Sequence, residues 1–184
     1  MTAIPMNIPN ILTLGRIVLI VPLVWLMTIS GEVAMWGALA LYTVIALTDW
    51  FDGYIARKFN QMSEFGRFLD PIADKILVAA MFIALAANGA LDGWWLALPI
   101  IIMTREFLVA GLREFLGPKN VVVHVTSLAK WKTTMQMVAL GFLIPANLYI
   151  DADICGSLLL LVATVLTVIT GWQYFKAALP HLKG

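Results

Sequence analysis

Long apolar stretches separated by short polar breaks are the feature of this 184-residue chain that most constrains its fold. A membrane-spanning helix needs roughly 20 consecutive apolar residues, and hydrophobic residues make up 61% of this chain, against about half in a typical soluble domain. We therefore expect an all-α integral membrane protein, a single transmembrane domain over residues 1–184 with six transmembrane helices. The apolar stretches fall at about 8–29, 34–56, 68–87, 94–116, 122–147 and 154–178.

The N-terminal residues MTAIPMNIPNILTLGR contain neither a cluster of cations nor a small-residue cleavage site, so we expect no removable signal. Pro9 and Asn10 are typical of a helix start, with Asn10 able to act as the cap. A short interfacial segment on the inner membrane surface is expected before the first spanning helix.

The positive charges are distributed unevenly between the two sides of this six-helix arrangement. All twelve Lys and Arg lie on one side, because the connections 28–33, 88–93 and 145–153 contain none. Positive charge marks the cytoplasmic side of membrane proteins. We therefore expect a multi-pass protein with both termini in the cytoplasm.

Four aspartates interrupt the apolar pattern in the segment DWFDGYIARKFNQMSEFGRFLDPIADK, residues 49–75. At about 100° per residue, Asp49 and Asp52 share one helix face, and Asp70 and Asp74 share a face of the next helix. The loop between the two helices is short, so the helices are antiparallel neighbours and the two faces can meet. Small residues lie on the same faces and would let a bulky ligand approach the backbone: Gly53, Ala56, Gly66 and Ala73.

Four carboxylates that converge in or near a membrane cannot all stay ionised without counter-charge. Hard oxygen ligands favour Mg²⁺, Mn²⁺ or Ca²⁺. Four carboxylates suit two such ions, which is the arrangement used for in-line displacement at phosphorus. Arg57 lies beside the same face, where it could contact a phosphate or a base. The alternative is a charged cytoplasmic loop flanked by two helix caps.

The pattern Asp-x2-Asp-Gly-x2-Ala-Arg-x8-Gly-x3-Asp-x3-Asp, which begins at Asp49 and ends at Asp74, resembles the signature of the CDP-alcohol phosphotransferase family. The resemblance implies homodimers with a two-metal site, holding Mg²⁺ or Mn²⁺, in the cytoplasmic half of the membrane. It implies that Asp74 is a metal ligand and also the catalytic base. The other implied metal ligands are Asp49, Asp52 and Asp70, and the implied contacts to the CDP-linked donor are Asp52, Gly53, Ala56, Arg57 and Gly66.

Further cations exceed what the donor's pyrophosphate and its metals require, so we expect an acceptor that itself carries a phosphate. The alternatives are an ion pair of Arg105 with Glu106 of a neighbour, contact of Arg113 with anionic lipid, and snorkelling of Lys132 to the membrane surface. The candidates for the acceptor phosphate are Arg105, Arg113 and Lys130, with Arg16 and Lys132 as further candidates.

The blocks NILTLGR, TREFLVAGLREF and AKWKTTMQM resemble the bacterial branch of the family that uses glycerol 3-phosphate. The resemblance implies transfer of the phosphatidyl group from CDP-diacylglycerol to glycerol 3-phosphate, which gives phosphatidylglycerophosphate and CMP. It implies a bacterial inner (plasma) membrane protein, surrounded by membrane lipid, with its active site on the cytoplasmic side. No nucleic-acid partner is expected.

Three other interpretations remain open from the residues alone. A structural or scaffold membrane protein is one, but it leaves the matched aspartate faces and the excess of cations unexplained. A synthase of the same fold could use serine, inositol phosphate or phosphatidylglycerol as its alcohol. A divalent-cation transporter would also place acids in a membrane, but no acidic chain crosses this one. The acids of the outer halves lie near the outer loops: Glu32, Asp92, Asp151 and Asp153.

Overall fold

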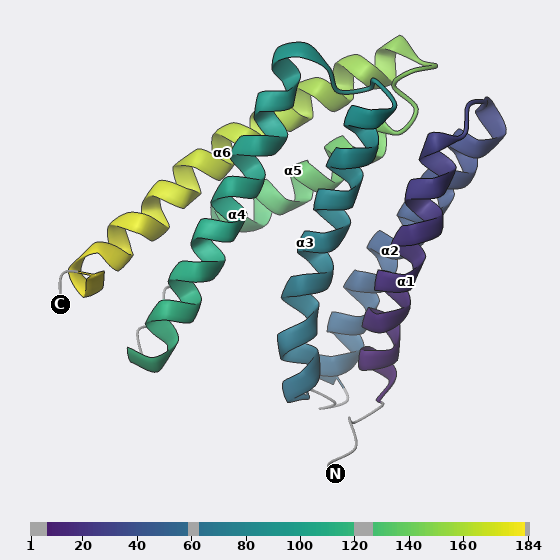
Figure 1. Cartoon of the computed structure of the whole chain (residues 1–184). Helices are drawn as coiled ribbons and strands as arrows, with labels where there is room; N and C mark the ends of the chain where they lie inside the picture. The colour runs from purple at the N-terminus through teal and green to yellow at the C-terminus, as the bar shows by residue number, and fades with distance from the viewer. Residues whose placement is uncertain (1–6, 59–62, 120–126, 183–184) are drawn as a thin grey trace. The chain divides into compact units, whose positions relative to one another are not determined.

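The computed structural model describes residues 7–58, 63–119 and 127–182, and every regular element in these ranges is a helix (Figure 1). The predicted all-α class is therefore confirmed for the described residues. The helices are α1 (Ile8–Thr28), α2 (Glu32–Lys58), α3 (Glu64–Ala87), α4 (Ala97–Leu116), α5 (Ser127–Leu143) and α6 (Ile150–Leu182), with 3-10 turns η1 (Gly93–Leu96) and η2 (Gly117–Lys119).

Four segments of the described residues are long and apolar enough to cross a membrane: Asn10–Thr28, Glu32–Asp49, Gly93–Leu116 and Ile150–Leu182. α3 is more polar, because Asp70, Asp74 and Lys75 lie in its first half. α5 is only 17 residues long in the described part of the chain and contains Lys130 and Lys132. The chain is thus a membrane protein with four candidate spans, and the count of six stays a prediction.

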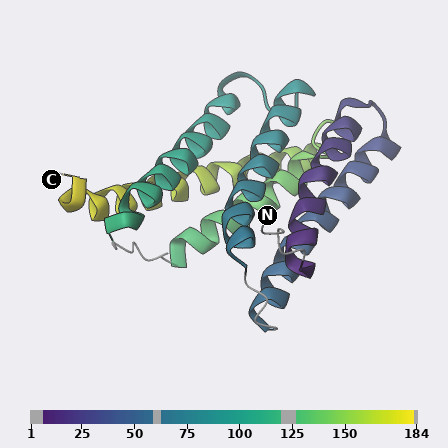
Figure 2. The same cartoon turned by 60° about the horizontal axis from the view of Figure 1, so that its bottom comes forward.

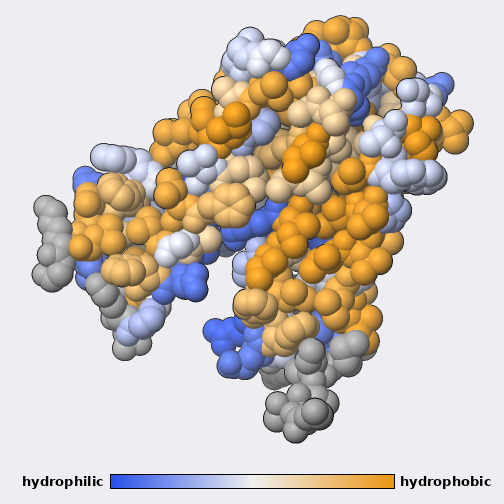
Figure 3. Space-filling view, in the orientation of Figure 1, coloured by the Kyte–Doolittle hydropathy of each residue, from blue (hydrophilic) through white to orange (hydrophobic). Residues whose placement is uncertain are grey.

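Large apolar side chains are exposed along the candidate spans. Val18, Val21 and Trp25 of α1 are 68%, 71% and 62% exposed, and Val33 of α2 is 89% exposed. Figure 3 shows apolar residues over much of the visible surface. Soluble monomers rarely expose large continuous apolar patches, so these faces fit an environment of lipid.

The chain divides into two compact units, Met1–Ala90 and Leu91–Gly184. In the first unit, α1 packs against both α2 and α3, and Figure 2 shows the three helices side by side. In the second unit, α6 packs against both α4 and α5. The predicted single domain over residues 1–184 stays a prediction. Fully buried side chains form the core of each unit: Leu23, Ile45, Leu77 and Met81 in the first, and Ile102, Leu140, Leu143 and Leu160 in the second.

The start of α1 differs from the sequence expectation by one helical turn. Asn7, not Asn10, is the N-cap, and its side chain accepts a hydrogen bond from the backbone N–H of Asn10 at 3.1 Å. Asn10 lies inside the helix and is 1% exposed, so the prediction that it caps the helix was wrong. The expected interfacial segment, at the start of this helix, stays a prediction.

Candidate functional site

Three helices of the first unit bring carboxylates together around one arginine of α1. Nη1 of Arg16 donates to Oδ1 of Asp49, on α2, and to Oδ1 of Asp74, on α3, the latter at 3.0 Å. One turn earlier, Oγ1 of Thr13 donates to Oδ1 of Asp70 at 2.9 Å. We call these five residues the acid cluster. The prediction that the aspartate faces of α2 and α3 meet is therefore confirmed for Asp49 and Asp74.

The charged side chains of the acid cluster differ in their exposure to solvent. The side chain of Arg16 is 0% exposed, whereas those of Asp49 and Asp74 are 45% and 57% exposed. The guanidinium thus supports the carboxylates from the buried side and leaves part of each carboxylate open. A buried cation requires such partners, because an unpaired charge in the interior is strongly destabilising.

A polar contact between α1 and the start of α3 holds the two helices in register beside the cluster. Oγ of Ser63 accepts from the backbone N–H of Gly66 at 2.9 Å, which caps α3. The same hydroxyl donates to Oδ1 of Asn10 on α1 at 2.9 Å. A Cβ at position 66 would lie 2.8 Å from Oδ1 of Asn10. Gly66 therefore has a packing role at this helix contact, whether or not it also borders a ligand.

Several predicted site residues cannot be placed. Asp52, Gly53, Ala56 and Arg57 belong to α2, but their side chains lie outside the described part of the structure. Within the described part, no three His, Cys, Asp or Glu side chains form a group that could hold a metal ion. The two-metal site and the donor contacts therefore stay predictions. The chemistry of the cluster fits a divalent cation, because Asp49 and Asp74 are hard oxygen donors that already share one cationic group.

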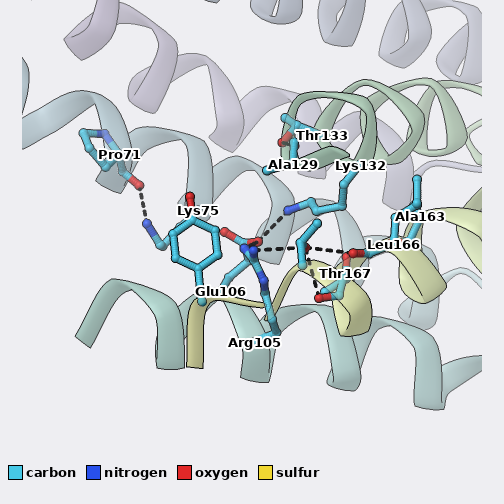
Figure 4. Close-up of polar contacts among 12 residues, drawn as sticks. Pro71, Lys75, Arg105, Glu106, Ala129, Lys132, Thr133, Ala163, Leu166 and Thr167 are labelled. Atoms are coloured by element: carbon cyan, nitrogen blue, oxygen red, sulfur yellow. Dashed lines mark hydrogen bonds and ion pairs between the residues drawn. The ribbon is translucent and has the colours of Figure 1, made fainter. Parts of the chain in front are cut away.

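The second unit contains a cluster with the opposite arrangement of charge. Oε1 of Glu106, on α4, accepts from Nη1 of Arg105 at 2.9 Å and from Nζ of Lys132, on α5, at 2.5 Å. Figure 4 shows both cations reaching this carboxylate. Nη2 of Arg105 also donates to Oγ1 of Thr170, on α6, at 3.1 Å. One acid thus joins cations from two helices.

Tyr174 of α6 connects Arg105 with a third cation. The guanidinium carbons of Arg105 and Arg113 lie 5.4 Å and 5.1 Å from the centre of its ring, within range of a cation–π interaction. Nη2 of Arg113 donates to the Tyr174 hydroxyl at 2.8 Å. We call this group, together with Gly171, against which Arg105 packs, the basic cluster: Arg105, Glu106, Arg113, Lys132, Thr170, Gly171 and Tyr174.

The structure brings together some of the predicted acceptor-phosphate residues. Arg105 and Arg113 meet at Tyr174, whereas Lys130 is exposed on α5, and the contacts of the described residues do not link it to either arginine. Lys132 is 4% exposed and paired with Glu106. The snorkelling alternative for Lys132 was therefore wrong. Arg16, a further candidate for the acceptor phosphate, belongs to the acid cluster.

Sequence reasoning missed the partners that surround these charges. Thr13 and Arg16 lie three residues apart on a helix that is otherwise largely apolar, and Thr167, Thr170 and Tyr174 follow the same kind of spacing on α6. A polar residue buried in such a helix needs a hydrogen-bond partner. That spacing is the signal by which these partners could have been found. For Arg105, the proposed ion pair with Glu106 forms within this chain.

Comparison with known proteins identifies a family for this chain. The family model for CDP-alcohol phosphatidyltransferases matches residues 6–170. A protein of Rickettsia bellii is 46% identical over 93% of this chain and 94% of its own length. Similar proteins of Escherichia coli strain K12 and Cereibacter sphaeroides are 40% and 39% identical, over 94% and 96% of this chain and 94% and 97% of their own lengths.

All three relatives are named CDP-diacylglycerol–glycerol-3-phosphate 3-phosphatidyltransferase. The matched region contains the whole acid cluster and most of the basic cluster, since it ends at residue 170 within α6. The chain belongs to the CDP-alcohol phosphatidyltransferase family.

Proposed function

We propose that this protein transfers the phosphatidyl group from CDP-diacylglycerol to glycerol 3-phosphate, which gives phosphatidylglycerophosphate and CMP. The names of near-full-length relatives support this pair of substrates. The observation that carries the chemistry is the acid cluster, in which carboxylates from two helices are held partly open above a buried arginine. Such a cluster suits displacement at phosphorus, where negative charge must be balanced by cations.

The proposed metal ligands are Asp49, Asp52, Asp70 and Asp74, which would hold two Mg²⁺ or Mn²⁺ ions. When bound, such ions supply Lewis-acid stabilisation of the negative charge that develops on the phosphoryl oxygens. Asp74 is also the proposed base: a carboxylate oxygen accepts the proton of the acceptor hydroxyl. The open fraction of the Asp74 side chain supports this role, because a base must reach the hydroxyl that it deprotonates.

The cytidine diphosphate part of the donor is proposed to lie along Asp52, Gly53, Ala56, Arg57 and Gly66. Small residues let a bulky ligand approach the helix backbone. Arg57 would donate to a phosphate or to the base. This assignment rests on the match between the sequence pattern and the family.

The acceptor phosphate is proposed to bind Arg105, Arg113 and Lys130, with Lys132 as a further contact. Nε of Arg105 supports the assignment, because it is buried and has no hydrogen-bond partner among the described residues. A buried donor without a partner costs free energy, and a phosphate oxygen would remove that cost. Glu106 already neutralises part of the charge of Arg105 and Lys132, so acceptor binding would use the surplus.

The proposed topology has six spans with both termini and the active site on the cytoplasmic side of a bacterial inner membrane. The restriction of all twelve Lys and Arg to one side of the six apolar stretches supports it. A homodimer is proposed from the family pattern.

The experiment that tests the proposed function measures CMP release by purified protein in detergent micelles. CDP-diacylglycerol is offered with glycerol 3-phosphate, glycerol, serine, inositol phosphate or phosphatidylglycerol, each with Mg²⁺, with Mn²⁺ and with EDTA. We expect fast release only with glycerol 3-phosphate and only with a divalent cation. Equal or faster release with another alcohol would assign the protein to a different synthase of the family.

A labelling experiment tests the topology. Single cysteines replace Gly31, Gly89, Asn147, Gln61 or Lys119 in a Cys155→Ser background, because Cys155 is free and exposed. An impermeant thiol reagent added to intact cells should label the first three positions. The other two should react only after the inner face is opened. Labelling at position 119 from outside would contradict the six-span arrangement.

A further inference from the structure

Helix α1 contributes no acidic residue to the acid cluster, yet it contacts all three described aspartates. Arg16 bonds to Asp49 and Asp74, which belong to two different helices, and Thr13 bonds to Asp70. The carboxylates therefore do not depend only on α2 and α3 for their positions. Two side chains of α1 fix the orientation of three acids.

The contacts come from one polar face of α1. Asn10, Thr13 and Arg16 follow one another at intervals of three residues, and each is 1% exposed. Asn10 accepts from Ser63, the residue that caps α3. This contact fixes the position of α3 along the axis of α1, so that Thr13 and Arg16 lie opposite Asp70 and Asp74.

The identity of Arg16 matters for geometry as well as for charge. One nitrogen of its guanidinium joins Oδ1 of Asp49 and Oδ1 of Asp74. A guanidinium is a planar group with several fixed donors, whereas a lysine ammonium is a point charge on a flexible stem. A lysine at position 16 would keep the positive charge, but its ammonium turns freely on a flexible stem and would hold the two carboxylates less rigidly.

We propose that Arg16 and Thr13 are positioning residues for the metal-binding carboxylates: from the buried side, they hold Asp49, Asp70 and Asp74 in the arrangement that receives divalent cations. The inference rests on the proposed function, because it assigns those aspartates to metal ions. It assigns α1 a part in the active site that the signature on α2 and α3 does not contain. Arg16 thereby belongs with the metal ligands, and not with the acceptor phosphate.

The test measures Mn²⁺ binding to purified protein without substrates, by electron paramagnetic resonance of the free ion. Arg16→Lys keeps the charge near the ions constant, so a change in the Kd for Mn²⁺ reports geometry. We expect that Kd to rise about tenfold or more, which is the usual effect of removing a group that orients a metal ligand. Arg67→Lys is the matched control, because it makes the same charge-conserving change at an exposed position of α3, and its Kd should stay within about twofold of wild type.

A second pair of variants decides the question if Arg16→Lys lowers the melting temperature so far that the protein is not folded. Thr13→Val is nearly isosteric and removes only the hydroxyl that donates to Asp70. Thr13→Ser keeps that hydroxyl. We expect Thr13→Val to raise the Kd for Mn²⁺ several-fold and Thr13→Ser to keep the wild-type Kd. A purely packing role of the side chain would not produce this pattern.

The outcomes separate this inference from the proposed function. Wild-type affinity for Mn²⁺ in both Arg16→Lys and Thr13→Val would overturn the positioning role and leave the proposed reaction intact. A wild-type protein that binds no Mn²⁺ and releases CMP at full rate in EDTA would overturn the metal site, and the positioning role with it. A raised Kd for Mn²⁺ in Arg16→Lys, with a wild-type Kd in Arg67→Lys, would support the positioning role.

Discussion

The acid cluster of the first unit and the basic cluster of the second unit each surround one ion with ions of the opposite sign, and the signs are reversed between the two clusters. In the acid cluster, one fully buried guanidinium lies beneath carboxylates that are about half exposed. In the basic cluster, the carboxylate of Glu106, 21% exposed, lies between Arg105 and Lys132, which are 13% and 5% exposed. Each cluster contains one ion of the minority sign and a surplus of the other sign.

The clusters differ in how exposed the ions of the majority sign are. The surplus carboxylates of the acid cluster are open and can accept cations directly. In the basic cluster, Arg105 and Lys132 are mostly buried, and Arg113 is exposed but lies against the ring of Tyr174. A fixed cationic site selects its ligand strongly, because a ligand without negative charge leaves buried cations unneutralised. We therefore expect metal exchange at the first cluster and substrate selection at the second.

The largest expected effect is on turnover at the acid cluster. Asp49→Asn or Asp70→Asn should lower kcat for CMP release by about a hundredfold or more, since each removes a charged ligand from a proposed two-ion site. The measurement is steady-state release at saturating substrates and Mg²⁺. Glu64→Gln is the control, because Glu64 is an exposed acid in the first turn of the same helix as Asp70. Equal losses in Glu64→Gln and Asp70→Asn would contradict a specific role for the cluster.

The next effect concerns binding of the acceptor at the basic cluster. Arg105→Ala should raise the KM for glycerol 3-phosphate about ten- to a hundredfold, which is the range for loss of a hydrogen bond to a charged group. The KM for CDP-diacylglycerol should change little. Arg105→Lys should recover only part of the loss, since an ammonium cannot grip two phosphate oxygens as a guanidinium does. A rise confined to the donor KM would move Arg105 into the donor site and remove the contrast between the clusters.

A smaller effect is expected on stability when Glu106, the one acid of the basic cluster, loses its charge. Glu106→Gln removes the negative charge that joins Arg105 to Lys132, and we expect it to cost about 1–3 kcal/mol of stability, less than for a fully buried pair. The melting temperature in detergent should fall by several degrees. Glu114→Gln, an exposed acid on the same helix, should leave it unchanged. An unchanged melting temperature in Glu106→Gln would mean that Glu106 is not an anchor of the cluster.

The smallest effect tests how Arg105 is held against α6. A Cβ at Gly171 would lie 2.8 Å from Cγ of Arg105, so Gly171→Ala must displace the arginine stem. We expect a rise of a few-fold in the KM for glycerol 3-phosphate, with kcat nearly constant. Gly111→Ala is the control, because nothing lies within 4 Å of its added Cβ, and it should be neutral or slightly stabilising. Equal effects of the two variants would show that the contact does not matter.

Local sequence patterns were sufficient to predict the helices and the aspartate faces of α2 and α3. The apolar stretches predicted helices that agree with α1 to α6 to within a few residues, because the period and length of apolar runs are local properties. The aspartates at 49, 70 and 74 were predicted to meet because a short loop forces neighbouring helices to be antiparallel. The membrane spans of α3 and α5 were not confirmed, since charges shorten the apolar run of α3 and α5 has only 17 residues in the described part of the chain.

Only the tertiary structure decided which partner each charge has. Arg16 was a candidate for the acceptor phosphate and proved to be the buried partner of Asp49 and Asp74, 33 and 58 residues later in the chain. Lys132 was a further candidate for the acceptor phosphate, with snorkelling as the alternative, and it pairs with Glu106 on another helix. The periodicity of one helix shows which residues share its face, but not the height or rotation of the helix packed against it. Burial makes the pairing of each charge obligatory, whereas the packing of the helices chooses the partner.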